Sequence, residues 1–402
     1  MKHLKKALAA AASVLVVLAG ATPATAGSGA PLDEAALRDS LTSIVRGPVP
    51  GVYSAVRAGD ELWAGAAGKA DTATGAPMRA GMYHRIGSVS KMFVATAILR
   101  LVDRGRIGLD RPVEEYAPGL LGGDRRITVR MLLNHTSHLP DHLNWLYAGA
   151  HVSVELLRLS ALPKTQLVKG ALLAERTGVP GQLPGVYSNT GYVVLGLLLE
   201  KVTGEPAERF ITREVIRRAG LGQTFYPRGA ELPRPHARAY SDLGGLLKTP
   251  GDFSTYDVSA LSMAGDLVAT MPDVNRFLAA LLSGRLVSPA SLAEMKKTVP
   301  VAAAPGLAGD PYGFGIAPLL DYGCGPTWGH VGMLWGATTW AVTTEDGSRQ
   351  VTLGVNKSHP AGGAAETSAV ARHIALALCG TVAAKPGTVR PPSHGLPLPA
   401  KR

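Results

Sequence analysis

The sequence is poor in cysteine and has no long apolar run beyond its first residues. Only two of the 402 residues are cysteine, and neither follows the N-terminal segment as a lipid-attachment site. No later stretch is apolar for long enough to cross a bilayer. No basic run is interleaved with aromatic residues, which argues against nucleic-acid binding. These absences predict a protein with no membrane span and no nucleic-acid partner.

The first 26 residues have the composition of an export signal. Met1–Lys6 is basic, an apolar run extends from Ala7 to about Gly20, and Ala24–Ala26 matches an A-x-A cleavage site. An uncleaved membrane anchor is the alternative, but the run is short for a span. We expect residues 1–26 to be a signal peptide and the mature protein to be secreted to the cell wall.

The remaining chain is basic and large enough to bury a substantial core. The full sequence carries a formal charge of +11, and the segment 1–26 holds three lysines and no acid, which leaves 38 basic and 30 acidic residues and a charge of +8. In an exported protein this charge would attract anionic wall polymers. Diffuse charge that aids solubility is the other interpretation. With 46% hydrophobic residues, we expect one or two domains.

Three short motifs each occur once: Ser88-Val-Ser-Lys91, then Tyr187-Ser-Asn189, then His330-Val-Gly332. In a helix, positions i and i+3 share a face, so the Lys91 amine would lie beside the Ser88 hydroxyl. A serine hydroxyl is a poor nucleophile until a base takes its proton. Lysine can be that base only if its surroundings lower its pKa.

Each motif also has an ordinary structural interpretation. Lys91 could be a solvated surface residue, and Tyr187 could be a packed aromatic with a hydroxyl partner. Asn189 could cap the following helix, because asparagine is a favoured N-cap, and His330 could be a core histidine. The joint occurrence of the three motifs favours a catalytic site over these alternatives.

Together the motifs resemble the serine β-lactamase/D-alanyl-D-alanine carboxypeptidase superfamily, whose pattern includes S-x-x-K. The resemblance is greatest to the secreted, H-x-G-bearing penicillin-binding peptidases and their class C β-lactamase relatives, and it runs from about Ala35 to Gly380. It implies a D-alanyl-D-alanine carboxypeptidase, with an esterase or a class C-like β-lactamase as the alternative. It implies no cofactor, a monomer, and a peptidoglycan peptide, a β-lactam or a small ester as substrate.

The resemblance also implies a role for each motif residue. Ser88 would be the nucleophile that forms an acyl-enzyme, and its backbone N–H would stabilise the oxyanion together with that of Met333. Lys91 and Tyr187 would transfer protons, and the sequence leaves open which of the two deprotonates Ser88.

The remaining motif residues would bind the substrate. Asn189 would bond the substrate amide and orient Lys91. His330, which replaces the lysine of a K-T-G motif, would shape the electrostatics near Tyr187, and Gly332 completes the H-x-G motif.

The predicted fold is α/β, an antiparallel sheet flanked by helices plus a mostly α-helical lobe, as in β-lactamases and transpeptidases. Apolar periodicity predicts helices over 33–46, 91–102, 193–202, 208–217, 273–282 and 364–378, and strands over 52–58, 62–68, 312–317, 336–344 and 350–355. We expect an α/β domain from 27–106 and 301–380, a mainly helical domain over 107–300, and a disordered proline-rich tail over 381–402.

Two departures from the family pattern bear on the substrate. Val331 stands where relatives have a threonine whose hydroxyl holds the terminal carboxylate of the substrate. The peptidases also carry an arginine near the strand that ends around Ala317, where this chain has Ala-Pro-Leu-Leu. Both changes weaken the expectation of a carboxypeptidase and favour an esterase.

A cluster of His135, His138, Asp141 and His142 has metal-like spacing, which makes a zinc hydrolase the rival class of enzyme. Pro140 lies within the cluster and prevents one continuous helix from presenting the three rings together. We therefore expect no metal site. His138 stands where the family has glycine, which predicts a strained backbone there.

The two cysteines are Cys324 and Cys379. One precedes the predicted His330 strand and the other ends the last predicted helix. In an oxidising compartment we expect them to form a disulfide bond. Two buried free thiols are the alternative.

Overall fold

The computed structural model describes residues 31–148, 158–243, 247–358 and 363–380. The predicted signal peptide and the predicted C-terminal tail lie outside the described residues.

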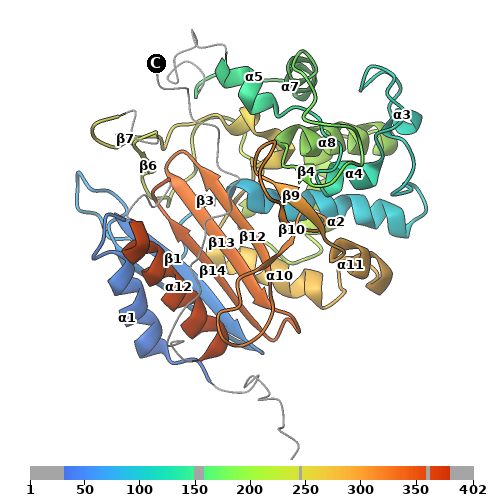
Figure 1. The fold of residues 1–402 in the computed structure, drawn as a ribbon. Coiled ribbons are helices and arrows are strands. Elements are labelled where there is room, and N and C mark those ends of the chain that lie inside the picture. Colours follow the sequence, from blue (N-terminus) through green and yellow to red (C-terminus); the bar gives the residue numbers. More distant parts are fainter. Residues whose placement is uncertain (1–30, 149–157, 244–246, 359–362, 381–402) are drawn as a thin grey trace, which may run out of the picture.

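A six-stranded sheet draws its strands from both ends of the chain (Figure 1). Its order is β11-β12-β13-β14-β1-β2, and every neighbouring pair is antiparallel. The strands are β1 (Gly51–Ala58), β2 (Glu61–Gly68), β11 (Ala317–Leu319), β12 (Thr327–Leu334), β13 (Ala337–Thr344) and β14 (Arg349–Val355). The expected fold class, an antiparallel sheet flanked by helices, is confirmed.

Helices cover both faces of this sheet because its strands are apolar on both sides. Val52 and Val56 pack with α1 (Glu34–Ile44) and α12 (Gly363–Cys379) on one face. Tyr53 and Ala55 point to the opposite face, as the two-residue period of a strand requires, and join the core under α10 (Met271–Leu282). The sheet is therefore the middle layer of three.

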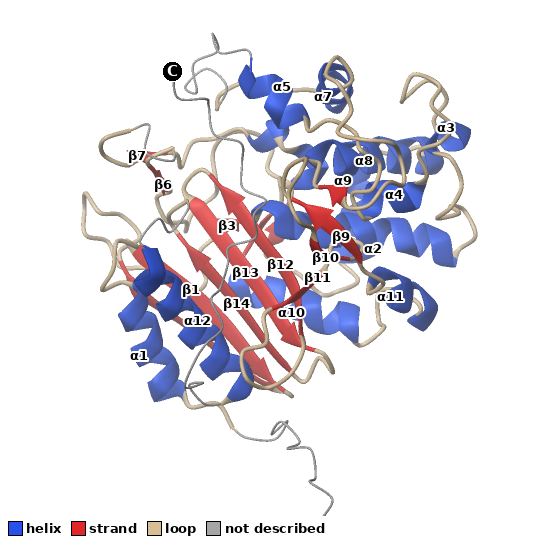
Figure 2. Ribbon diagram, in the orientation of Figure 1, coloured by secondary structure: helices blue, strands red, loops and turns tan. Residues whose placement is uncertain are grey.

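The rest of the described chain is mainly helical and packs beside the sheet (Figure 2). Two helices, α2 (Ser90–Asp103) and α8 (Asn189–Thr203), run through its centre and are buried along most of their length. Around them lie α3 (Val113–Tyr116), α4 (Val129–Leu133), α5 (His142–Ala148), α7 (Lys164–Ala171), α9 (Ala207–Ile211) with its π-helical continuation η2 (Thr212–Ile216), and α11 (Pro289–Met295).

Short strands form three further sheets, of order β10-β9-β4, β3-β8-β5 and β6-β7, separate from the six-stranded sheet. Their bounds are β3 (His84–Arg85), β4 (Gly185–Val186), β5 (Thr224–Phe225), β6 (Tyr240–Ser241), β7 (Gly251–Asp252), β8 (Val268–Ala269), β9 (Val299–Ala302) and β10 (Asp310–Tyr312), and the 3-10 turns are η1 (Gly87–Val89), η3 (Val258–Ala260) and η4 (Ser262–Ala264). The division into two domains stays a prediction.

The strand predicted over 312–317 is wrong, because β10 ends at Tyr312 and β11 begins at Ala317. Two glycines break it. A Cβ on Gly313 would lie 2.2 Å from the Met295 carbonyl oxygen, and Gly315 has a φ of +69° and would place a Cβ 2.7 Å from the Lys91 carbonyl oxygen. The segment connects two different sheets and packs against α11 and α2 on the way.

Cys324 and Cys379 form the expected disulfide bond, with their Cα atoms 5.4 Å apart. It ties the segment before β12 to the end of α12. Within the described residues, no helix combines the length and the apolar character needed to cross a bilayer.

Candidate active site

Ser88 lies in the 3-10 turn η1, which leads directly into α2. Its neighbours Gly87 and Val89 are buried, whereas Ser88 is partly exposed. Lys91 follows one turn later, and its Nζ lies 3.0 Å from Ser88 Oγ. The spacing of the first motif therefore places the amine beside the hydroxyl, as predicted.

Lys91 is completely buried, and its Nζ has three hydrogen-bond partners. Besides Ser88 Oγ, these are Asn189 Oδ1 at 2.8 Å and the Ala264 carbonyl oxygen at 2.7 Å. The last two can only accept. A neutral amine would donate its two protons to them and keep its lone pair for Ser88, the one partner with a proton to give.

Burial lowers the pKa of Lys91 to about 7, while the charges of Asp141 and Asp266 act in the opposite direction. A general base works best when its pKa lies near the working pH. Near pH 7 a large fraction of Lys91 is therefore neutral and able to accept the Ser88 proton.

Tyr187 follows β4, and its backbone N–H donates to the Ala302 carbonyl at 2.9 Å. Lys91 Nζ lies 4.9 Å from the centre of its ring. Burial raises the pKa of Tyr187, and a hydrogen bond with the Ser88 side chain acts in the opposite direction. The phenol is thus protonated at neutral pH, so it is equipped to donate a proton rather than to take one from Ser88.

Asn189 is the first residue of α8, but it does not cap the helix. Its backbone N–H and its side-chain Nδ2 both donate to Asp141 Oδ2, at 3.0 and 2.8 Å. These bonds fix the amide so that its oxygen faces Lys91. Asp141, considered above only as a metal ligand, is thus a site residue that sequence reasoning missed.

His330 lies on β12 and is buried. Its Nδ1 donates to the Val331 carbonyl at 2.7 Å, so in the neutral ring its Nε2 accepts from the Tyr312 hydroxyl, 2.9 Å away. The Tyr312 ring in turn packs edge-on against the Tyr187 ring, with 6.0 Å between the two ring centres. Tyr312 thus stands between His330 and Tyr187 and is a second residue that the motifs did not reveal.

The strand β12 passes so close to η1 that only glycine fits at the contact. A Cβ on Gly332 would lie 2.0 Å from the Ile86 carbonyl oxygen and 3.0 Å from the Ser88 backbone nitrogen. On the other side, Gly87 has a φ of +55°, and a Cβ there would lie 2.9 Å from the Met333 backbone nitrogen. The approach brings together the backbone N–H groups of Ser88 and Met333, the expected oxyanion pair.

His135 contacts the backbone and the ring of the second motif. Its carbonyl accepts the Val186 N–H at 3.1 Å and its Nδ1 accepts the Ser188 N–H at 3.2 Å. Its ring centre lies 4.1 Å from that of Tyr187. The residue has a φ of +61°, which is unusual for a side chain other than glycine. His135 therefore contacts three consecutive residues around Tyr187.

The other two histidines of the cluster serve the structure. The ring of His138 bonds Thr177 and the Gln182 carbonyl, and the ring of His142 bonds Thr190 and the Ala260 carbonyl. The backbone of His138 has a φ of +53°, in line with the strain predicted for a glycine position. Throughout the described ranges, no group of three or more His, Cys, Asp or Glu side chains could hold a metal ion.

A buried carboxyl group outside the motifs lies near Lys91. Asp266 follows the Ala264-Gly265 turn, and its Oδ1 has no hydrogen-bond partner among the described residues. Burial, followed by the charge of Glu208, raises the pKa of Asp266 to about 8. No sequence pattern identifies it, because it reaches Lys91 only through the tertiary fold.

The residues at the two positions where relatives bind a substrate carboxylate are apolar in this chain. Val331 is 7% exposed and packs in a core cluster with Trp340. The strand β11, which pairs with the start of β12, consists of Ala-Pro-Leu and offers no guanidinium group.

Comparisons with known proteins agree on the family. Residues 34–376 match the family model described as Beta-lactamase. The crystal structure of a D-stereospecific amidohydrolase from Streptomyces sp. is 33% identical and superimposes with a TM-score of 0.75 over 87% of this chain and 99% of that chain.

Two curated proteins add further activities. Esterase EstB from Burkholderia gladioli is 32% identical over 47% of this chain and 52% of its own length. Penicillin-binding protein 4 from Amycolatopsis lactamdurans is 27% identical over 74% of this chain and 72% of its own. The chain spans about half or less of the length of the first curated relatives that it matches.

Proposed function

The chain belongs to the β-lactamase family of serine hydrolases, and on that premise we propose that it hydrolyses D-configured amides or esters through a Ser88 acyl-enzyme. The observation that best supports this proposal is the set of hydrogen-bond partners of Lys91. Two pure acceptors and one hydroxyl surround a buried amine whose pKa is about 7. This arrangement suits removal of the Ser88 proton.

The proposed reaction has two stages. Lys91 takes the Ser88 proton as Oγ attacks the substrate carbonyl, and the backbone N–H groups of Ser88 and Met333 stabilise the negative oxygen. Tyr187 gives its proton to the leaving amine or alcohol and regains one from Lys91. Water then hydrolyses the acyl-enzyme by the reverse proton path.

The apolar surroundings support a neutral leaving group. Pairing a free carboxylate requires hydroxyl or guanidinium donors, and Val331 and β11 supply neither. An unpaired carboxylate in a partly desolvated site costs free energy. The resemblance to a D-stereospecific amidohydrolase supports a D-configured acyl group.

A D-alanyl-D-alanine carboxypeptidase is the second candidate, and the similarity to a penicillin-binding protein supports it.

The proposed location of the protein is the same for both candidate activities. We propose that the protein acts outside the cytoplasm, at the cell wall, because its first 26 residues have the composition of an export signal.

Covalent labelling tests the nucleophile. The wild-type protein should be labelled by a fluorescent penicillin or a fluorophosphonate, and Ser88→Ala should lose the label while its circular dichroism is unchanged. A folded Ser88→Ala protein that is still labelled would eliminate Ser88 as the nucleophile.

A comparison of kcat/KM between substrates tests the preference for a neutral leaving group. We expect kcat/KM for a D-alanine amide or p-nitrophenyl ester to exceed that for a D-Ala-D-Ala peptide and for the L-alanine counterparts. Val331→Thr should narrow the gap between ester and peptide. A wild-type preference for the free-carboxylate peptide would instead establish the carboxypeptidase.

A further inference from the structure

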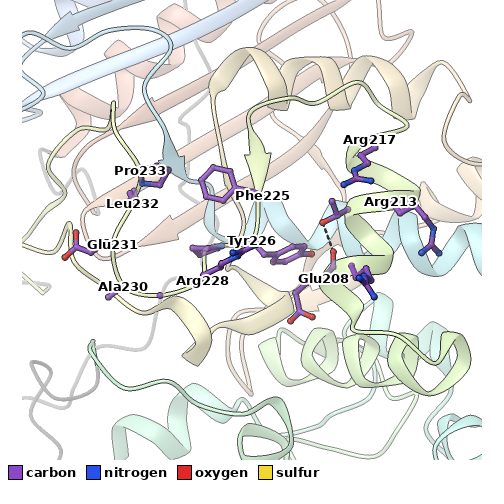
Figure 3. Close-up of a pocket in the computed structure, with 14 residues that line it drawn as sticks. Glu208, Arg213, Arg217, Phe225, Tyr226, Arg228, Ala230, Glu231, Leu232 and Pro233 are labelled. Atoms are coloured by element: carbon purple, nitrogen blue, oxygen red, sulfur yellow. Dashed lines mark hydrogen bonds between the residues drawn. The ribbon is translucent and has the colours of Figure 1, made fainter.

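A cavity of about 1250 Å³ lies between the α9–η2 helical segment and the loop that follows β5. Figure 3 shows Arg213 and Arg217 on the helical side, and Phe225, Tyr226 and Arg228 on the other. None of its lining residues belongs to the Ser88 site. The proposed hydrolysis therefore does not explain this cavity.

The lining is rich in arginine. Arg209, Arg213 and Arg217 are spaced four residues apart along one helical segment, and Arg228 comes from the opposite loop. Like charges at this spacing face the same side of a helix and repel one another. An anion bound between them would remove that repulsion.

Acidic side chains do not neutralise this row. Two glutamates also line the cavity. Glu208 pairs with Lys164 at 2.5 Å, whereas Glu231 accepts only a hydroxyl hydrogen bond from Thr255 at 2.9 Å, so its single carboxylate is outnumbered by the arginines. Arg213 pairs with Glu205 and Glu214. In the part of the chain that the structure describes, the guanidinium groups of the other three arginines have no ion pair or hydrogen bond: Arg209, Arg217 and Arg228.

An aromatic wall completes the cavity. Phe225 already packs edge-on against Tyr83, so Tyr226 is the ring left to contact a ligand. The Tyr226 hydroxyl is buried, so what this residue offers a ligand in the cavity is its ring, which can pack against carbon.

We propose that this cavity is a binding groove for a phosphodiester polymer with sugar or polyol repeats. Guanidinium groups bind phosphate oxygens in a two-pronged geometry, and the charge of +8 that remains without residues 1–26 would draw such a polymer to the protein. The cavity volume of about 1250 Å³ exceeds the roughly 300–1,000 Å³ of a small-molecule site, which suits a polymer segment.

Single-stranded nucleic acid is a poorer match, because its binding sites stack successive bases on several rings. Here Tyr226 alone remains for stacking. Binding in this groove would hold the protein on an anionic polymer and leave Ser88 free for its own substrate.

The test measures binding to a fluorescently labelled poly(glycerol phosphate) by anisotropy at about 50 mM salt, where charge screening is modest. We expect saturable binding by the wild type, and at least tenfold weaker binding by the variant Arg209→Gln/Arg217→Gln/Arg228→Gln. Circular dichroism confirms that each variant is folded. Absence of binding by the wild type would overturn the proposal, whether or not Ser88 is labelled by a penicillin.

A matched control distinguishes binding in the groove from attraction by the net charge of the protein. Arg46, Arg79 and Arg372 are also exposed and do not line the cavity. The variant Arg46→Gln/Arg79→Gln/Arg372→Gln loses the same charge and should bind within twofold of the wild type. An equal loss of affinity in both variants, or tighter binding of a single-stranded oligonucleotide than of the polymer, would overturn the proposal.

Discussion

At the scale of single residues, the proposed mechanism depends on the protonation state of Lys91. The spacing of the S-x-x-K motif was enough to predict that the two side chains meet, because i and i+3 share a helix face. Asp141 and Asp266, which both favour the charged form of Lys91, could not be predicted. They come from loops distant in sequence and reach the amine only in the folded protein.

The pH dependence of activity should follow Lys91. We expect kcat/KM to rise as the pH increases through about 7, where the buried amine loses its proton. Asp266, whose pKa is about 8, is mostly neutral near pH 7, so Asp266→Asn should leave the rise in place. Asp141→Asn removes the larger of the two charges that raise the pKa of Lys91, so with this variant the rise should move to lower pH. The measurement is kcat/KM for a neutral ester from pH 5 to pH 9. A profile that Asp141→Asn leaves unmoved would show that Asp141 has no influence on Lys91.

Asp266→Asn should change how the stability of the fold depends on pH. The pKa of Asp266 is about 8 in the folded protein, against 3.8 for a free aspartate side chain, so the folded state binds the extra proton. Stability is therefore lost as the pH rises from about 4 to 8. The Asp266→Asn protein has no ionisable group at this position, so its stability should fall less over this range. The difference in Tm between the variant and the wild type should therefore be larger at pH 9 than at pH 5. Calorimetry at the two pH values measures this difference.

We expect His135 to act by positioning Tyr187. His135→Ala removes both the ring packed on Tyr187 and the acceptor for Ser188, and kcat should fall roughly 10–100-fold. Tyr187→Phe should cost roughly 10²–10⁴-fold, as is usual for loss of a proton-transfer group.

A double-mutant cycle tests this role. In the Tyr187→Phe background, His135→Ala should reduce kcat by less than threefold. His138→Gly is the control, because His138 has the same left-handed backbone in the same loop but bonds Thr177 and Gln182 instead. If the His135 effect is equally large with and without the Tyr187 hydroxyl, the residue has only a structural role.

At the scale of elements, the close contact between β12 and η1 places the backbone nitrogens of Ser88 and Met333, the proposed oxyanion donors. We expected His330 to lie on a strand of the sheet, and the structure has that strand. The strand predicted over 312–317 was wrong because apolar composition does not reveal that Gly313 and Gly315 pack against other helices. Local pattern predicts an element well when its side chains, rather than close backbone contacts, determine its shape.

Gly332→Ala should separate β12 from η1. Its Cβ would lie 2.0 Å from the Ile86 carbonyl oxygen, so the backbone must shift. We expect labelling of Ser88 by a penicillin to slow at least 100-fold, as for loss of one oxyanion donor, with a loss of stability of roughly 1–3 kcal/mol. Gly81→Ala is the control, because no atom lies within 4 Å of its Cβ position. Equal labelling rates in the two variants would contradict the assigned oxyanion contact.

At the scale of the whole molecule, strands from the two ends of the chain form one sheet. The sequence predicted this arrangement because apolar strands lie near both ends, with helical periodicity between them. The disulfide between Cys324 and Cys379 was expected from the cysteine count and their positions, and the structure confirms it. The boundaries of the predicted helical domain stay a prediction, since its helices pack against the sheet in a continuous core.

Removing the disulfide should weaken the fold. The bond closes a segment whose ends are 55 residues apart, which corresponds to roughly 4 kcal/mol in the chain-entropy estimate. We expect Cys324→Ala/Cys379→Ala to lower the midpoint of urea unfolding accordingly, with Ser88 labelling retained under native conditions. A midpoint equal to that of the wild-type protein would show that the crosslink adds nothing to stability.

The pairing of β1 with β14 also affects how the protein is made. Val52 lies opposite Val355, so the centre of the sheet cannot close until nearly the whole chain has left the ribosome. Pairings this distant in sequence form slowly, and until then the hairpin of β1 and β2 exposes apolar surface that promotes association with other chains. Late closure would suit a polypeptide that is threaded unfolded through a membrane channel, as the proposed export requires, and that completes its sheet on the far side.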